Sequence, residues 1–188
     1  MTSSDEKTLK LLVSLSDGAV RLVPFDDSHI EGLRAACAED EYIWDIYPIS
    51  MLGEHFDRSV AMLSTMTDYL RFAVLHEDRV VGMTHFLKPD PEKGIVEIGG
   101  TYISPLVRGT SFNRIMKTLM IDHAFASGFH TIAFRIDTRN GRSMRAVEKL
   151  GARQISILRK DMTTWTGYVR DAALFELKSA DWRKGGQS

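Results

Sequence analysis

The sequence predicts an α/β (α+β) domain with a mixed, mostly antiparallel central sheet and helices on both faces. Its apolar pattern switches between strand-like and helix-like periods, which gives the order β-β-α-α-β-β-β-α-β-α-β-β. Short turns join most neighbouring strand-like runs, as in antiparallel hairpins. One strand–helix–strand unit at 95–138 predicts instead a right-handed crossover between two parallel strands.

The size and composition are typical of one globular domain. The chain has 188 residues, of which 44% are hydrophobic and 26% are charged, within the usual range for such domains. We therefore expect one domain over 1–188, with a core at about 19–182. An N-terminal hairpin strand is expected at about 9–15, and a flexible tail at 183–188.

Composition also disfavours several functions. The formal net charge of −1 provides no global basic surface for nucleic-acid binding. The single cysteine, Cys37, permits no disulfide within the chain, and its helical surroundings favour a buried residue over a nucleophile. Metal-site spacings such as CxxC and HExxH are absent. No apolar run approaches the ~20 residues of a membrane span, and the polar N-terminus lacks signal-peptide features, so we expect a cytoplasmic protein.

The N-terminal part predicts a hairpin followed by two helices. Asp-Gly lies between the apolar runs 9–15 and 19–25, which is a hairpin signal. "DDSHIEGLRAACAED" predicts a helix with Asp27 or Ser28 as its N-cap. A second helix is expected within 51–69, after an aromatic-rich connection, "EYIWDIYPIS".

The remaining elements alternate more regularly. Two strands joined by "ED" precede a turn-rich loop at 88–94, and the next strand carries Gly99 and Gly100 in its middle. These glycines indicate either an opening of the sheet or close packing. The other expected elements are a helix at 111–127 ended by Gly128, a strand at 130–137, a short helix at 141–150, and two closing strands at 152–164 and 167–178.

The bend "PLVRGTS", at 105–111, has the parts of a phosphate-binding loop. A helix N-terminus offers free backbone N–H groups and a partial positive charge. Gly109 permits a sharp turn, Thr110 and Ser111 can cap the helix or donate to phosphate oxygens, and Arg108 adds a planar cationic fork. A plain connection capped by Ser111 is the alternative, because the bend matches neither a Walker loop nor GxGxxG.

From 19 to 182 the chain resembles the GNAT superfamily of acyl-CoA-dependent N-acyltransferases, and most closely the branch of the ribosomal-protein N-terminal acetyltransferases. The resemblance rests on five stretches in order: "VRLVPF", "FAVLHEDRVVGMTHF", "VEIGGTYISPLVRGTSFNRIMKTLMIDHAF", "RIDTRNGRSMRAVEKLGARQISILRK" and "GYVRDAALFELKSADW". It implies the acyl-CoA N-acyltransferase fold, in which strand 95–103 splays from its parallel neighbour at 131–138. The gap admits the pantetheine arm of CoA much as an added strand would.

The resemblance also implies a site for acetyl-CoA as co-substrate, with no metal. The family's pyrophosphate pattern falls on Arg108, Ser111 and Asn113, and Ser111 departs from the usual glycine. In "NGRS", Asn140 is expected to contact the CoA arm and Ser143 to lie near the thioester sulfur. Asn140 can equally cap the following helix. The expected cofactor-binding residues are Ile103, Arg108, Gly109, Thr110, Ser111, Phe112, Asn113 and Asn140.

Glu97 is the candidate general base, because the resemblance places a glutamate there and an acidic residue in an apolar strand acquires a raised pKa. A solvated or ion-paired strand residue is the alternative. The helix after Asn140 lacks the tyrosine that many members use as general acid; Tyr102 and Tyr168 are available but not placed by the sequence. His85 and His123 are interpreted as structural residues.

Trp44 and Tyr47 fall where this branch places an aromatic lining of the acceptor pocket, although core packing explains them equally well. The resulting prediction is an N-acetyltransferase acting on a primary amine: a protein N-terminus, an amino acid, a polyamine or an aminoglycoside-like amine. A non-catalytic acyl-CoA-binding module or sensor is the alternative. The closing hairpin at 152–178 suggests a homodimer.

Overall fold

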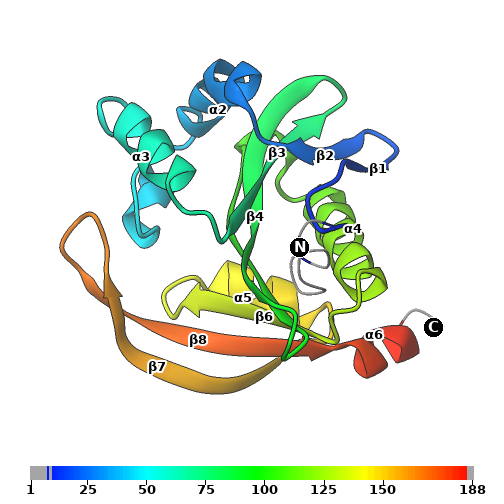
Figure 1. The fold of residues 1–188 in the computed structure, drawn as a ribbon. Coiled ribbons are helices and arrows are strands. Elements are labelled where there is room, and N and C mark those ends of the chain that lie inside the picture. Colours follow the sequence, from blue (N-terminus) through cyan, green and yellow to red (C-terminus); the bar gives the residue numbers. More distant parts are fainter. Residues whose placement is uncertain (1–7, 9, 186–188) are drawn as a thin grey trace.

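The protein forms one eight-stranded sheet in the order β1-β2-β3-β4-β5-β6-β8-β7 (Figure 1). The computed structural model describes residue 8 and residues 10–185. The strands are β1 (Leu15–Asp17), β2 (Val20–Pro24), β3 (Tyr69–His76), β4 (Arg79–Asp90), β5 (Ile95–Ile103), β6 (Thr131–Asp137), β7 (Arg153–Thr163) and β8 (Val169–Lys178). The helices are η1 (Asp27–His29), α2 (Ile30–Cys37), η2 (Tyr42–Ile46), α3 (His55–Ser64), η3 (Pro105–Val107), α4 (Phe112–Ala126), α5 (Gly141–Glu148) and α6 (Ser179–Gly185).

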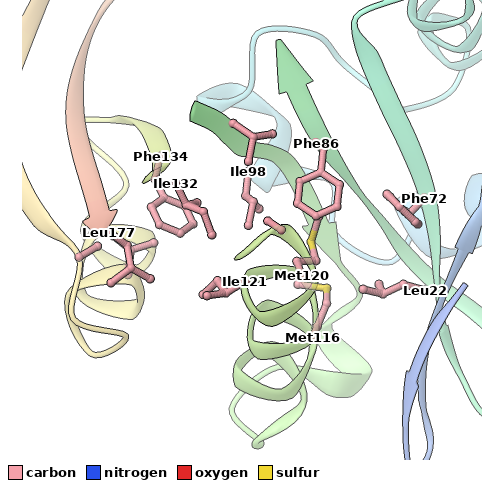
Figure 2. Packing of buried hydrophobic residues seen from close by; sticks show 14 of the residues in the cluster. Leu22, Phe72, Phe86, Ile98, Met116, Met120, Ile121, Ile132, Phe134 and Leu177 are labelled. Carbon is pink, nitrogen blue, oxygen red and sulfur yellow. The ribbon is translucent and has the colours of Figure 1, made fainter. Parts of the chain in front are cut away.

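Two apolar clusters cover opposite faces of the sheet, because neighbouring strand residues point to opposite sides. On one face α4 and α5 pack on side chains such as Phe86 and Ile98. In Figure 2 the apolar side chains of α4 lie between one group from β6 and β8 and another from β2, β3 and β4. On the other face α2, η2 and α3 pack on Met83 and Tyr102. The predicted fold class, with helices on both faces, is confirmed.

The sheet opens between β5 and β6. These strands pair in parallel only from Ile95, opposite Thr131, to Glu97, opposite Ala133. Each strand continues beyond that point, so the two part immediately after Glu97. The other paired strands among residues 15–178 are antiparallel. The predicted splay at a parallel pair is therefore present.

A β-bulge shapes the same stretch of β5. The pairing of β4 with β5 shifts between Met83 and His85, and Gly100 has a φ of +55°. A Cβ at Gly100 would lie 2.6 Å from Nδ1 of His85, so glycine is required here for both conformation and space. The sequence left open whether the glycine pair marks an opening of the sheet or close packing. Both hold at Gly100, which packs closely on His85 in the stretch of β5 that faces the opening.

Several predicted boundaries were wrong. Residues 8 and 10 are helical, and the first strand of the hairpin is β1 rather than 9–15; Leu9 lies outside the described residues. The helix before Ile30 is capped by Asp26, whose side chain accepts from the Ser28 backbone N–H at 2.9 Å, rather than by Asp27 or Ser28. Strand β4 extends into the expected loop as far as Asp90. The tail expected from 183 is helical to Gly185, and 186–188 lie outside the described residues.

At Gly82 of β4 there is no room for a side chain against β5, and Gly82→Ala is expected to destabilise the fold by about 1–3 kcal/mol. A Cβ there would lie 2.1 Å from the backbone oxygen of Tyr102, which cannot rotate away. Gly141→Ala is the matched control, since its nearest neighbour is the flexible tip of Arg145 at 3.2 Å. Urea unfolding of both variants measures the difference; equal stabilities would contradict the prediction.

Candidate active site

A cavity of about 560 Å³ occupies the opening between β5 and β6. It is lined from both faces of the sheet. Asn113 and Lys117 of α4 and Ser143 of α5 contribute from one face, whereas Leu63 and Tyr69 contribute from the other. The opening in the sheet therefore connects two half-sites, one on the α4 side and one on the α3 side.

The bend that precedes α4 forms one end of this cavity. Gly109 turns the chain with a φ of +78°, and a Cβ there would meet no atom within 4 Å. The Thr110 hydroxyl accepts from the Phe112 N–H at 3.1 Å and donates to the Val107 carbonyl at 2.9 Å. Thr110 therefore caps the helix, whereas the exposed Ser111 makes no capping hydrogen bond with its side chain. Of the residues expected to bind the cofactor in this bend, Arg108, Gly109, Thr110 and Asn113 line the cavity. Ser111 and Phe112 do not, and Phe112 is buried in the core. The first turn of α4 still offers backbone N–H groups of the kind that bind an anion.

Arg108 is positioned differently from the expectation of a free cation beside a phosphate. Its Nε donates to the Ile103 carbonyl at 2.7 Å, and its Nη1 pairs with Asp40. The guanidinium also lies 5.3 Å from the centre of the Tyr102 ring. Burial raises the pKa of Asp40, but the hydrogen bond and charge of Arg108 outweigh it, so this pKa lies below its ordinary value. Arg108 thus holds the bend against the connection between α2 and η2.

Arg108→Ala is expected to reduce the free energy of unfolding at pH 7 by about 1–3 kcal/mol, because Asp40 then loses its half-buried partner. A carboxyl group whose pKa is lower in the folded protein stabilises the fold at pH values above its unfolded pKa of about 3.9. This stabilisation is lost as the pH falls through the pKa that the group has in the folded protein. The difference from wild type should therefore shrink in acid. Urea unfolding across pH 3–7 measures this, with Arg58→Ala, at an exposed position of α3, as control; a pH-independent difference would contradict the ion-pair explanation.

Glu97 lies where the two strands part. Its side chain is 15% exposed and lines the cavity. Leu87 lies directly across from it on β4, and Tyr69 lies across from Leu87 on β3, so all three share the α3-side face. Burial raises the pKa of Glu97, against a smaller lowering by Arg135. The contact with Arg135 is loose, at 3.8 Å, since that guanidinium also donates to Asp161 at 3.0 Å.

The "NGRS" segment forms the N-terminus of α5 at the cavity wall. Asn140 caps the helix, with its side-chain oxygen accepting from the Ser143 N–H at 3.1 Å. Both residues line the cavity. The capping interpretation of Asn140 is therefore confirmed, and the same position leaves its amide nitrogen and the Ser143 hydroxyl available to a ligand.

The two aromatic residues expected in the acceptor pocket, Trp44 and Tyr47, differ in their access to the cavity. Tyr47 lines the cavity and donates to the Thr101 carbonyl at 2.5 Å, and burial raises its pKa to about 12. Trp44 is fully buried behind it, stacked on Tyr102 at 4.7 Å between ring centres. The Tyr102 hydroxyl donates to Ala36 at 2.6 Å, away from the cavity. Tyr168 lies outside the cavity wall, beneath Arg139 at 3.8 Å.

Three further polar residues line the cavity, and sequence reasoning either missed them or regarded them as structural. Tyr69 and Lys117 were missed, although a lysine four residues after Asn113 on a helix was a usable signal. His85 was regarded as structural, yet it is 2% exposed, lines the cavity and has an Nδ1 without a partner in the described structure. Burial lowers the pKa of His85 to about 4, so the ring is neutral near pH 7.

The described residues contain no group of three or more potential metal ligands. Among the helices in the described part of the chain, none has the length and apolarity needed to cross a membrane. The buried Cys37 has a pKa raised by desolvation, which makes it a poor nucleophile.

Residues 19–153 match the family model described as an acetyltransferase (GNAT) domain. A GCN5-related N-acetyltransferase from Brucella melitensis is 26% identical, with a TM-score of 0.81 over 92% of this chain and 81% of that one. None of the curated proteins gives a significant match.

Two more distant structures share the fold. A ribosomal-protein-S5-alanine acetyltransferase from Vibrio fischeri is 16% identical, with a TM-score of 0.70 over 90% of this chain and 98% of that one. A spermidine N-acetyltransferase from Vibrio cholerae, solved with CoA and spermine, is 14% identical, with a TM-score of 0.72 over 89% and 99%.

Proposed function

Because the chain belongs to the GNAT acetyltransferase family, we propose that it transfers an acetyl group from acetyl-CoA to a primary amine by direct attack within a ternary complex. The observation that most supports this is the cavity through the opening of the sheet. It joins a helix N-terminus suited to a diphosphate with a buried carboxylate suited to proton transfer.

The donor would occupy the α4 side of the cavity. Backbone N–H groups within residues 108–113 would hold the diphosphate. Those of Arg108 and Phe112 already donate to the Pro105 carbonyl and the Thr110 hydroxyl, so the others would bind it, with Arg108 stabilising the bend.

The pantetheine arm would lie along β5 after Glu97, up to Ile103, where β6 no longer pairs with it. The Thr101 and Ile103 carbonyls already accept from Tyr47 and Arg108, so the arm would bind the other backbone groups of this stretch. Asn140 would contact the arm, and Ser143 would lie beside the sulfur.

Glu97 would act as general base at the junction of the two half-sites. It would take a proton from the acceptor ammonium, and the freed amine nitrogen would attack the thioester carbonyl carbon. A backbone N–H of β5 would stabilise the oxyanion. The carbon–sulfur bond then breaks and the nitrogen loses its second proton, which the departing sulfur takes up, giving the amide and the CoA thiol. The Ser143 hydroxyl would hydrogen-bond the sulfur as it leaves.

The α3 side of the cavity would hold the acceptor. Its wall includes Leu63, Met66, Leu87 and Met162 beside Tyr69. Such a surface suits a primary amine attached to an apolar group, for instance a peptide N-terminus with an apolar first residue. It suits a polyamine less well, since several spaced carboxylates would be needed to pair with its charges. Tyr47 would belong to this wall, with Trp44 fixing it from behind.

Calorimetric titration with acetyl-CoA and CoA, followed by an amine screen that detects thiol release, tests this function. Saturable binding and amine-dependent thiol release would support it. Absence of binding by the folded protein would contradict it. Binding without turnover on any amine would favour the alternative, a non-catalytic acyl-CoA-binding module.

A homodimer through the closing hairpin is a further part of the proposal. Strand β7 is the edge of the sheet and exposes Ile155 and Ile157 by 52% and 41%. An edge strand with exposed apolar residues favours pairing with a second copy. Sedimentation velocity at micromolar concentration should give a dimer, and Ile157→Lys should shift it to monomer; a wild-type monomer would contradict this.

A further inference from the structure

Lys117 is a buried amine in the donor half of the cavity. It lies on α4 among apolar residues, is 7% exposed and lines the cavity. Its Nζ donates to the Thr101 hydroxyl on β5 at 2.7 Å. That hydroxyl lies 2.7 Å from the Thr84 hydroxyl on β4, so two neutral groups hold the amine in place.

The amine has no negative partner in the described part of the chain, where the ion pairs do not include Lys117. His85 is the neighbour of Thr84 on β4 and points to the opposite face of the sheet, beside Tyr69. Its pKa is lowered mainly by burial and to a smaller extent by the charge of Lys117. Burial lowers the pKa of Lys117 to about 7. An amine with three donors and one hydroxyl partner is costly to bury, so donor capacity remains for a group entering the cavity.

The position of the Lys117 amine along the opening indicates which part of the donor it would contact. Thr101 lies between Ile103, at the mouth beside the bend, and Glu97, where the strands meet. Lys117 is five positions after Phe112, about 7.5 Å down the helix from its N-terminus. The amine is therefore below the expected diphosphate and above the expected thioester. The part of the donor that spans this interval is the pantetheine arm, whose polar groups are amides.

We propose that Lys117 is a further donor-binding residue, whose Nζ donates a hydrogen bond to an amide carbonyl of the pantetheine arm. This inference rests on the proposed function. The Thr84–Thr101 hydroxyl pair orients the amine, and the helix carries it to the inner edge of the opening. Donation to the arm strengthens as the amine becomes an ammonium group, so arm binding takes up a proton at a pH above the amine's pKa.

The test uses pantetheine, which carries the arm and no phosphate. Lys117→Met keeps the buried stem and removes the donor, and it should weaken both CoA and pantetheine by about tenfold or more. Ser111→Asp, at the diphosphate end, should weaken CoA and leave pantetheine unchanged. Lys93→Met is the control for a lysine that is exposed and paired with Asp90. Saturation-transfer NMR detects weak pantetheine binding, and calorimetry measures CoA.

A second measurement can overturn the assignment with the wild type alone and uses Lys117→Met as its control. Titration with CoA at pH 8 in two buffers of different ionisation enthalpy should show proton uptake, and this uptake should disappear in Lys117→Met. Wild-type protein that binds CoA without proton uptake, or Lys117→Met that binds pantetheine like the wild type, overturns the assignment of Lys117. Wild-type protein that binds neither ligand overturns the proposed function itself.

Discussion

Glu97→Gln is expected to lower kcat by about 10²–10⁴-fold while leaving the affinity for CoA unchanged. The carboxylate lies at the junction of the two half-sites, where the paired part of β5 and β6 ends. Glutamine keeps the shape and loses the ability to accept a proton. Steady-state kinetics with the best amine of the screen, together with calorimetry of CoA, separates the two effects.

The same residue predicts a pH dependence. Burial raises the pKa of Glu97 above its ordinary value, so kcat/KM of the wild type should fall as the pH decreases through that raised pKa. The Glu97→Gln variant should not show this fall in kcat/KM at acidic pH. A raised carboxyl pKa means that the folded state binds the proton more tightly, so ionised Glu97 costs stability at neutral pH and this cost disappears in acid. Glu97→Gln should therefore be at least as stable as the wild type at pH 7.

Glu148→Gln, on the exposed side of α5, is the matched control and should behave like the wild type in both kinetics and stability. A Glu97→Gln variant with wild-type turnover would remove Glu97 from the mechanism and make a different cavity residue the base. Neutral His85, with its pKa lowered to about 4, is then the next group to test.

The sequence was sufficient for the order of the elements and for the parallel pair, because both depend on local signals, whereas the opening in the sheet was predicted from the resemblance to the GNAT family. Alternation and helical periodicity mark each element, and the crossover after 95–103 requires a parallel pair. The helix N-terminus after Gly109 and the capping role of Asn140 are also encoded within a few residues. Glu97 was chosen as a candidate from the resemblance and from its acidic character in an apolar strand, before its surroundings were known.

The contacts of individual side chains depended on distant residues and were not predictable in this way. Arg108 pairs with Asp40, which lies 68 residues earlier, instead of being the free cation that was expected. Trp44 lies behind Tyr47 because η2 directs it onto Tyr102. The contact of Lys117 with Thr101 requires the bulge at Gly100 and the packing of α4 on β5. A single sequence shows none of these pairings.

Ser111→Asp is expected to separate the stability of the bend from its binding role. An aspartate at this N-cap position can accept from the free N–H groups and interacts favourably with the helix dipole, worth about 0.3–1 kcal/mol of added stability. The same charge would lie against the diphosphate, so the affinity for CoA should fall by about 100-fold or more. Thermal unfolding and calorimetry of the same sample would show these opposite effects.

Ser111→Ala is the control, because Thr110, and not Ser111, supplies the existing cap. It should lose little stability and retain most of the CoA affinity, since the backbone N–H groups remain. If the bend only connects β5 to α4, Ser111→Asp should change stability without changing the affinity for CoA. If Ser111→Asp instead binds CoA as tightly as the wild type, the diphosphate does not lie at the N-terminus of α4, and the direction of the donor through the opening must be reversed or abandoned.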